Sequence, residues 1–307
     1  MTSAAETVGR ADDRTLPQRK GTTLPTVFIA PAVVAVFLVS IYPVFDALLL
    51  SLHQTRYAEK LRFVGLQNYV ALWNDASISS AAVNSLVYTA ASLALVVPLS
   101  LGLALLLDAR IPLKSAARTV VILPWVVSQT VVALLWAWLL NADFGPVTWA
   151  VQGLTGQRPA ALASPVGAMV ALVIVNVWAS YPQATLLLLA AVQTVPRDLY
   201  EAARIDGASA WRRFRYVTLP LIRPTLLVVL IQLTLLYFNM VTLIFTLTGG
   251  GPLGATETLS VRVLKISFED WNLGRGAALG LVITVINFLM SAFYVRALRR
   301  PAGGQQR

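Results

Sequence analysis

The chain has 307 residues, of which 57% are hydrophobic and 12% are charged, and its formal net charge is +10. A soluble domain carries about 25% charged residues, so this composition excludes an ordinary soluble protein and indicates an integral membrane protein. The sequence contains no cysteine, so it offers neither disulfides nor cysteine-based metal or redox chemistry.

Six charge-free stretches run through the sequence, at residues 21–45, 76–107, 119–142, 159–196, 224–256 and 276–295. About 20 apolar residues suffice to cross a bilayer as a helix, so we expect an all-α membrane protein. Its six transmembrane helices are expected at residues 23–50, 82–107, 118–140, 166–192, 224–247 and 276–298. Together they make one domain, residues 23–299, between polar tails at 1–22 and 300–307.

The Lys and Arg residues are unevenly distributed over the connections between these helices. If the N-terminus is cytoplasmic, 17 of the 24 basic residues lie in cytoplasmic segments and 7 in outer segments. Cytoplasmic loops of membrane proteins are enriched in Lys and Arg, so both termini are expected in the cytoplasm. The basic excess then sets the orientation of the chain, and we expect no nucleic-acid partner.

The expected spans carry amide, hydroxyl and aromatic side chains at depth rather than charged ones. They are Asn176, Ser180, Tyr181 and Gln183 in the fourth span, Gln232, Tyr237 and Asn239 in the fifth, and Asn287 in the sixth. Asn176, Ser180 and Gln183 follow at i, i+4 and i+7 and so share one helix face. An ion-coupled carrier needs charged groups at depth, so the set favours a path for a neutral solute such as a sugar. The alternative is hydrogen bonding between helices, which stabilises membrane proteins by about 1 kcal/mol or less per contact.

The most polar connection is the loop 194–223, which contains the run YEAARIDGAS at 200–209. Asp198 is expected to cap a helix over residues 199–206, with Glu201 three residues on as in a capping box. The small side chains in the middle of this helix allow another backbone to approach closely. The loop therefore contains an ordered helix where a flexible linker would suffice.

Gly207 is expected to end this helix in a left-handed turn. Ser209 then caps a second short helix, which is expected to end at Leu219-Pro220. A helix–glycine–helix loop has two plausible uses. It presents a docking surface to a soluble partner, or its arginines hold anionic lipid headgroups at the membrane surface. The residues by themselves leave both uses open.

The run Glu201-Ala-Ala-Arg-Ile-Asp-Gly-Ala208, followed by Phe214 and Leu219-Pro220, resembles the EAA loop in the permease subunits of binding-protein-dependent ABC importers. The spacing matches without gaps. The resemblance implies a type I ABC importer permease fold, in which this loop is the coupling element that seats in a groove of a cytoplasmic ATPase. Carried over by position, the coupling residues are Leu199, Glu201, Ala202, Ala203, Asp206, Gly207 and Ala208.

Two further segments, FVGLQNY at 63–69 and LTGGGP at 247–252, resemble carbohydrate-type permeases of the maltose, trehalose and glycerol-phosphate group. The resemblance covers residues 25–298. It implies a multi-pass protein of a bacterial cell membrane that pairs with a second permease subunit, two cytoplasmic ATPase subunits and an extracytoplasmic sugar-binding protein, in contact with membrane lipids. The particular sugar is left open.

The sequence has no GxxxxGK[ST] run, so the chain is not expected to bind ATP through a P-loop. We expect a transport subunit rather than an enzyme, without a cofactor or metal of its own, and with ATP and Mg bound by the partner ATPase. Two other functions remain as alternatives. One is an ion-coupled secondary sugar carrier, which needs charges at depth. The other is a membrane scaffold protein, for which the loop is only a lipid anchor.

Overall fold

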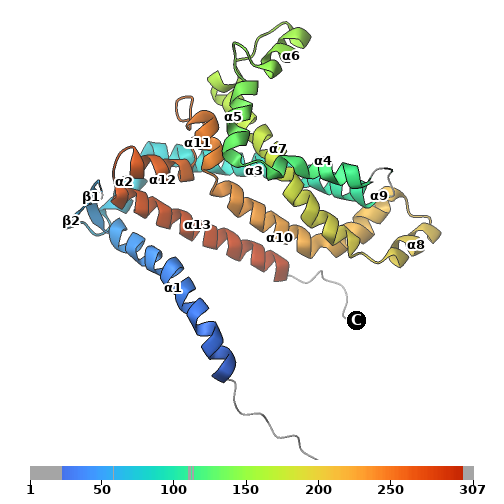
Figure 1. The fold of residues 1–307 in the computed structure, drawn as a ribbon, viewed down its shortest axis with the longest axis horizontal. Coiled ribbons are helices and arrows are strands. Elements are labelled where there is room, and N and C mark those ends of the chain that lie inside the picture. The colour runs from blue at the N-terminus through green and yellow to red at the C-terminus, as the bar shows by residue number, and fades with distance from the viewer. Residues whose placement is uncertain (1–22, 58, 110–111, 113, 300–307) are drawn as a thin grey trace, which may run out of the picture. The chain divides into compact units, whose positions relative to one another are not determined.

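A computed structural model describes residues 23–57, 59–109, 112 and 114–299, and the expected polar tails at 1–22 and 300–307 lie outside this part of the chain. The described part of the chain divides into two compact units, with the boundary between Asp46 and Ala47. The elements, labelled in Figure 1 where there is room, are α1 (Thr23–Ser51), β1 (His53–Arg56), β2 (Glu59–Phe63), α2 (Gln67–Trp73), α3 (Ala76–Asp108), α4 (Lys114–Val126), α5 (Gln129–Leu139), α6 (Pro146–Thr155), the 3₁₀ turn η1 (Ala161–Ala163), α7 (Pro165–Gln193), α8 (Arg197–Ile205), α9 (Ala210–Arg213), the π-helical turn η2 (Phe214–Thr218), α10 (Leu219–Phe238), α11 (Thr242–Thr248), α12 (Leu259–Phe268) and α13 (Leu273–Arg299).

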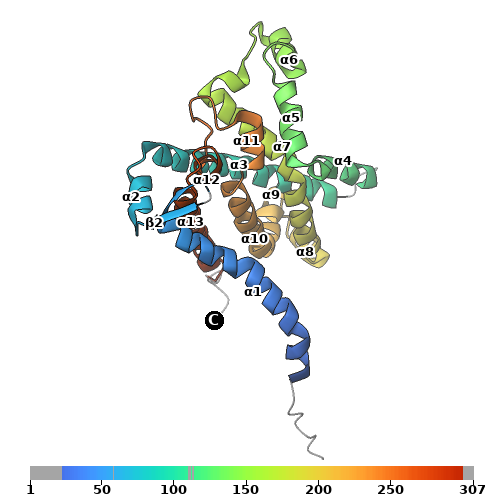
Figure 2. The same cartoon turned by 60° about the vertical axis from the view of Figure 1, so that its left-hand side comes forward.

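Among the described residues, five helices are long and apolar enough to cross a membrane, and the bent pair α4 and α5 makes a sixth if it counts as one span. The chain turns by 93° between these two helices. Figure 2 shows α4 and α5 running in different directions. Ser128 caps α5 at the break, because its hydroxyl accepts a hydrogen bond from Val131 N at 3.4 Å. The expected all-α membrane architecture is confirmed, and the third expected span is broken by this capped turn.

Several spans begin or end away from the expected residues. The fifth was expected at 224–247, but α10 begins at Leu219 and ends at Phe238, and α11 follows as a separate helix. Helix α3 begins at Ala76, where the carboxylate of Asp75 accepts a hydrogen bond from Ser77 N at 3.0 Å and so caps the helix. Helix α1 continues past Asp46 to Ser51. The expectation that no charged residue lies within a span is therefore wrong at Asp46.

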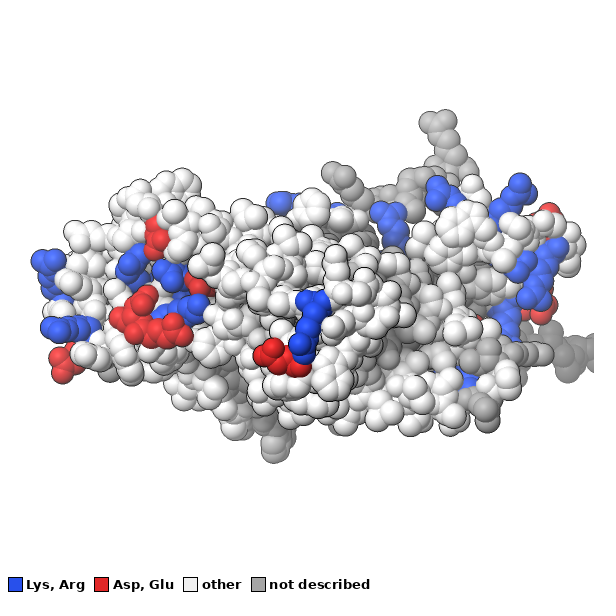
Figure 3. Space-filling view, turned by 90° about the horizontal axis from the view of Figure 1, so that it is seen from above, with Lys and Arg blue, Asp and Glu red and all other residues white. Residues whose placement is uncertain are grey.

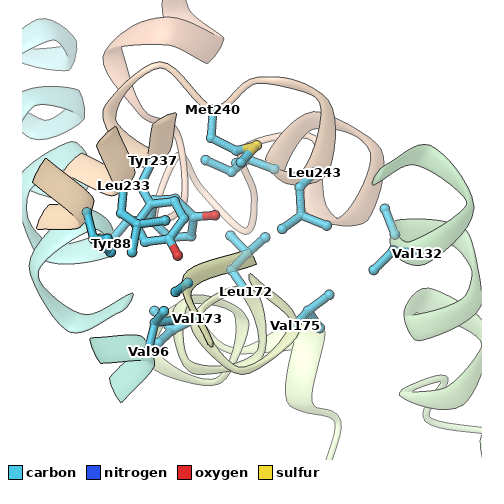
Figure 4. Close-up of a cluster of buried hydrophobic side chains, with 14 of the residues drawn as sticks. Tyr88, Val96, Val132, Leu172, Val173, Val175, Leu233, Tyr237, Met240 and Leu243 are labelled. Atoms are coloured by element: carbon cyan, nitrogen blue, oxygen red, sulfur yellow. The ribbon is translucent and has the colours of Figure 1, made fainter. Parts of the chain in front are cut away.

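The core of the second unit lies between α3, α7 and α10. Helix α3 packs along α7, and α10 packs against both. Figure 4 shows Tyr88 of α3 beside Tyr237 of α10, with both rings next to Leu172 and Val173 of α7. The two tyrosine ring centroids lie 6.5 Å apart, and both side chains are fully buried. Van der Waals packing of this kind holds helices together in a membrane, where lipid tails are as apolar as leucine.

The two ends of the second unit differ in structure. Helix α2, strand β1 and helix α12 pack around α13, and α8 and α9 lie at the opposite end of the helix bundle (Figure 1). Strands β1 and β2 pair antiparallel, with His53 opposite Phe63. These strands were not expected from the sequence. All five side chains of β2 are exposed, so the strand buries neither face.

Charged side chains gather at both of these ends. Figure 3 shows a wide and mostly uncharged surface between the two ends. A small group of acidic and basic side chains interrupts this surface. An uncharged surface between two charged ends is the pattern expected for helices that lie in the hydrocarbon core of a bilayer.

Candidate functional site

Helix α8 has the form expected for the coupling loop, with a different start. It ends at Ile205 with Asp206 as the C-cap residue, and Gly207 follows at φ +73°. Glycine adopts this left-handed conformation without a steric penalty, so the expected helix–glycine turn is confirmed. The expected N-cap is wrong: Pro196 occupies that position, and Asp198 lies in the first turn, where a carboxylate favours the positive end of the helix dipole.

The second helix of the loop is capped as expected but does not end where expected. The Ser209 hydroxyl accepts a hydrogen bond from Arg212 N at 3.3 Å and begins α9. The chain then stays helical through η2 and past Pro220 into α10. In an unbroken α-helix a proline ring meets the carbonyl of residue i−4. Pro220 lies in the first turn of α10, after the π-helical turn, and proline is tolerated in the first turn of a helix.

The surface of α8 is almost entirely exposed. Among the expected coupling residues, Leu199, Glu201, Ala202, Asp206 and Gly207 are exposed, and Ala203 and Ala208 are half-buried. Ile205 is 87% exposed and Leu199 is 43% exposed. Sequence reasoning did not include Ile205 among the coupling residues. Its position two residues before Gly207, at the end of a polar helix, is the signal that could have identified it as an exposed apolar side chain. A polar helix that leaves such side chains uncovered has a surface suited to a protein partner.

Two side-chain contacts hold this loop to the rest of the chain. The Tyr200 hydroxyl shares a hydrogen bond of 2.8 Å with Oγ1 of Thr218, the last residue of η2. The Tyr200 ring packs against a cluster of buried side chains formed by Ala191, Val192, Val195 and Ile222. Within the loop, Arg213 Nη1 donates a hydrogen bond of 2.8 Å to the carbonyl oxygen of Ala208.

The polar side chains of the expected solute path fall into two groups, the first of which is buried. The hydroxyls of Ser180 and Tyr237 share a hydrogen bond of 2.7 Å, and Ser180 Oγ also donates to the carbonyl oxygen of Asn176 at 2.6 Å. Asn176 and Ser180 lie within α7, Tyr237 lies within α10, and all three are buried. The bond between Ser180 and Tyr237 joins two helices, and the bond to Asn176 lies within α7.

The second group is exposed or half-buried. Gln232 and Asn239 are exposed on α10 and at its end, and Tyr181 and Gln183 are half-buried on α7. The side-chain amides of Asn239 and Asn287 form two reciprocal hydrogen bonds of 3.3 and 3.1 Å, which join α10 to α13. The structure thus brings Asn287 to Asn239 and separates these amides from the buried hydroxyl group.

The interior between α3 and α7 is more polar than sequence reasoning predicts. Of the eight buried side-chain polar atoms without a hydrogen-bond partner among the described residues, five belong to uncharged side chains on α3, α5 and α7: Tyr88 Oη, Thr89 Oγ1, Ser92 Oγ, Trp136 Nε1 and Asn176 Nδ2. Buried polar groups are usually hydrogen-bonded. Tyr88 and Ser92 are four residues apart and share a face of α3. The same i, i+4 spacing identified the polar face of α7, so it could also have identified this face of α3.

A network of charged side chains lies at the other end of the second unit, and sequence reasoning missed it. Asp75 Oδ2 lies 3.3 Å from Arg275 Nη2 and 3.7 Å from Arg262 Nη2. Glu257 lies 3.4 Å from Arg262 and 2.8 Å from Lys265. The residues come from segments nearly 200 positions apart, so no local spacing predicts the network. Among the described residues, no group of three or more His, Cys, Asp or Glu side chains is placed to hold a metal ion.

The environment of Asp75 lowers the pKa of its carboxyl group below the ordinary value of 3.8. The hydrogen bond from the Ser77 hydroxyl, 2.6 Å long, is the main cause. The Ser77 N–H and the two nearby guanidinium groups act in the same direction, and partial burial opposes them. Asp75 is therefore held in its charged form at the start of α3.

The long apolar helices and the exposed helix–glycine–helix loop define a multi-pass membrane transport subunit. A match to the family of binding-protein-dependent transport system inner membrane components covers residues 96–302. The chain belongs to this family, and it is a permease component of an ABC importer in the inner membrane rather than an enzyme.

Similar proteins agree with this assignment. The trehalose/maltose transport system permease protein MalF of Thermococcus litoralis is 35% identical over 264 residues, which cover 85% of this chain and 88% of that protein. The sn-glycerol-3-phosphate transport system permease protein UgpA of Agrobacterium fabrum is 32% identical over 283 residues, which cover 90% and 95%. A bacterial alginate ABC transporter, solved in complex with an alginate pentasaccharide-bound periplasmic protein, matches with a TM-score of 0.79 at 22% identity, covering 90% of this chain and 94% of that chain. The last likeness concerns the fold alone.

Proposed function

We propose that the chain is one of two permease subunits in an ATP-driven importer of a neutral saccharide, and that α8 docks into a separate cytoplasmic ATPase. The observation that carries the coupling role is the state of α8. Seven of its nine side chains are exposed, yet the helix is held in place by a capped turn and by Tyr200. A helix that is ordered and also uncovered is prepared for a partner.

The docking surface combines apolar and charged side chains. Leu199, Ala202 and Ile205 follow at intervals of three residues, and all three are exposed, whereas Ala203 is half-buried. Glu201 lies among them and supplies a charge at the edge of the apolar strip. We assign the contact with the ATPase to this surface, together with Asp206, Gly207 and Ala208 at the turn. ATP and Mg would be bound by the ATPase and not by this chain.

For the solute path we propose the exposed amides of α10 and α13. Gln232 and Asn239 are seven residues apart and share a helix face, and Asn287 adjoins them through Asn239. Amides donate and accept hydrogen bonds, as a sugar hydroxyl requires. The face would be covered by the second permease subunit, so that the path runs between the two chains. Tyr181 and Gln183 extend this set from α7.

The buried group has a different role in this proposal. The Ser180 hydroxyl bonds to the Tyr237 hydroxyl and to the backbone carbonyl of Asn176, all inside one subunit. The Ser180–Tyr237 pair holds α7 against α10 and so sets the shape of the wall from which the exposed amides project. In this proposal the pair supports the path without touching the solute.

The solute is proposed to be neutral because no Lys, Arg, Asp or Glu lies between Pro224 and Thr256, the segment that carries Gln232 and Asn239. A phosphorylated solute calls for a cation at the site. The names of the relatives include both a trehalose/maltose system and a glycerol-phosphate system. The uncharged face favours the former class.

The orientation follows from the bias of basic residues, which supports cytoplasmic termini and a cytoplasmic α8. The opposite end of the unit, with the charged network, would then face an extracytoplasmic sugar-binding protein. The apolar sides of the spans contact membrane lipids. These partners complete an importer with two permeases and two ATPase subunits.

The test is uptake by the reconstituted complex of this chain with its partner permease and ATPase. Proteoliposomes should accumulate radiolabelled trehalose or maltose in an ATP-dependent manner when the binding protein is supplied. Glu201→Ala should abolish uptake while the chain still inserts, and Gln193→Ala, an exposed position at the end of α7, serves as the control. If a variant with both Glu201 and Gly207 replaced retains ATP-dependent uptake, the coupling assignment is wrong. If sn-glycerol 3-phosphate enters and neither disaccharide does, the neutral-solute assignment is wrong.

A further inference from the structure

Tyr200 differs from the other large side chains of α8 in the direction of its contacts. The charged and branched side chains of this helix are exposed, whereas the Tyr200 ring reaches into the cluster of Ala191, Val192, Val195 and Ile222. Ala203, which is half-buried, is three residues away and shares this inner face. Tyr200 therefore joins α8 to the ends of α7 and α10 and takes no part in the exposed surface.

The partner of the Tyr200 hydroxyl is Thr218, which is only 2% exposed. Thr218 is the last residue of the π-helical turn, and α10 begins at the next residue. Any displacement of α8 that keeps the 2.8 Å hydroxyl pair intact must therefore move the first turn of α10. The same helix carries Gln232 and ends at Asn239, the amides proposed for the solute path.

We propose that the Tyr200–Thr218 hydroxyl pair is the joint that transmits movement of α8 to α10, and that Tyr200 is a positioning residue rather than part of the ATPase contact. The inference rests on the proposed coupling role of α8. The ring anchors the helix to the bundle through packing. The hydroxyl fixes the register between α8 and the start of α10, because a hydrogen bond of this length is directional and packing of an aromatic ring on alanine and valine is not.

The π-helical turn fits this role. Its hydrogen bonds run from residue i to residue i+5, and such turns occur frequently at functional sites. It lies between the capped start of α9 and Pro220, so α9 and α10 are one helix with a local change of register. The joint at Thr218 is placed at the end of that turn, where a change in the turn reaches α10 directly.

The test separates the hydroxyl pair from the ring. Tyr200→Phe keeps the ring and removes the hydroxyl, and Thr218→Val removes the other partner without changing the shape of the side chain. Both are expected to lower the amount of solute moved per ATP hydrolysed by about fivefold, the effect of losing one ordinary hydrogen bond. The double variant is expected to be no worse than either single one. Thr218→Ser retains a hydroxyl and should restore wild-type coupling.

The matched control is Tyr216→Phe, which removes a hydroxyl from the same turn at a position that is 71% exposed. It should leave uptake and ATP hydrolysis unchanged. ATP hydrolysis and trehalose uptake are measured on the same proteoliposomes. Retention of the ATPase subunit is measured on the purified complex from which they are made. If the hydroxyl pair is the joint, its variants lower uptake while the ATPase subunit stays bound and still hydrolyses ATP.

Two results would overturn the inference. One is wild-type uptake per ATP in both Tyr200→Phe and Thr218→Val. The other is loss of the ATPase from the purified complex in these variants, which would make Tyr200 a docking residue. Glu201→Ala in the same series separates this inference from the proposed function. If Glu201→Ala abolishes uptake and the hydroxyl variants do not impair it, only the joint is wrong; if Glu201→Ala transports normally, the coupling role of α8 fails.

Discussion

Lys265 Nζ lies 2.8 Å from Glu257 Oε2, and the backbone of Gly250 packs against this ion pair. A Cβ atom added to Gly250 would lie 3.1 Å from the Lys265 nitrogen and 3.2 Å from Glu257 Cβ. Gly250 also has φ +86°, a conformation that L side chains rarely adopt. Gly250, in the glycine run before Pro252, is therefore packed against the charged network.

Gly250→Ala should lower the thermal unfolding temperature of the purified chain more than Gly254→Ala does. Both glycines have positive φ, where alanine costs roughly 1–2 kcal/mol. Only Gly250 is crowded, because an added Cβ at Gly254 meets no atom within 4 Å. The unfolding temperature of both variants is measured by fluorescence in the same detergent. Equal decreases would contradict the prediction, because they would mean that the Lys265–Glu257 pair moves aside without a loss of stability.

The carboxyl group of Asp75 should make a pH-dependent contribution to stability. Its pKa is lowered in the folded state, so its contribution is fully present above the unfolded-state pKa of about 3.9. It is lost as the pH falls through the folded-state pKa. Asp75→Asn should therefore lower the unfolding temperature at pH 7, and the difference from wild type should shrink as the pH falls below about 4. Glu269→Gln, an exposed acid at the end of α12, is the control. A difference that stays constant down to pH 3 contradicts the prediction.

Local chemistry explains which parts of the coupling loop could be predicted. Gly207 and Ser209 define a turn and a cap through their own backbone and side chain, so the sequence predicts both correctly. Pro220 was expected to end a helix, but the chain passes from the π-helical turn into α10 with Pro220 in the first turn, where proline is tolerated. The register of a helix upstream of a proline is a property of several residues together, and a single-residue rule does not capture it.

Contacts between distant segments account for most of what the sequence does not predict. The hydroxyls of Ser180 and Tyr237 are 57 positions apart, and Asp75 and Arg275 are 200 positions apart. Spacing along α7 correctly places Asn176 and Ser180 on one face but cannot say whether that face meets a solute or another helix. In the structure it meets α10. Hydropathy also does not reveal the break between α4 and α5 at Ser128, because it measures how apolar a stretch is and not whether its helix is continuous.

The hydrogen bond between Ser180 and Tyr237 should stabilise the bundle without affecting solute affinity. Ser180→Ala, Tyr237→Phe and the double variant form a double-mutant cycle. The coupling free energy is expected to be about 0.6 kcal/mol, a typical value for hydrogen bonds between membrane helices. The KM for solute uptake should stay within experimental error in both single variants. A tenfold rise in KM would show that this pair contacts the solute and would overturn its structural assignment.

Asn239→Leu and Gln232→Leu should have the opposite effect. Each removes an amide from the exposed face of α10, so each is expected to raise the KM for uptake by about fivefold, the effect of one lost hydrogen bond. The maximal rate of ATP hydrolysis should change little, because neither residue lies near α8. Thr284→Val is the matched control: Thr284 is exposed on α13, but its hydroxyl already donates to the carbonyl oxygen of Gly280 at 2.9 Å.

Asn239 also bonds to Asn287, so Asn239→Leu has a second consequence: it removes a contact between α10 and α13. Asn287→Leu breaks the same amide pair from the other side and reports that effect. If Asn239→Leu lowers the unfolding temperature as much as Asn287→Leu does and leaves the KM unchanged, the amide pair is a helix contact. If the KM rises in Gln232→Leu as well, where no such pair is broken, the face of α10 is the one that meets the solute.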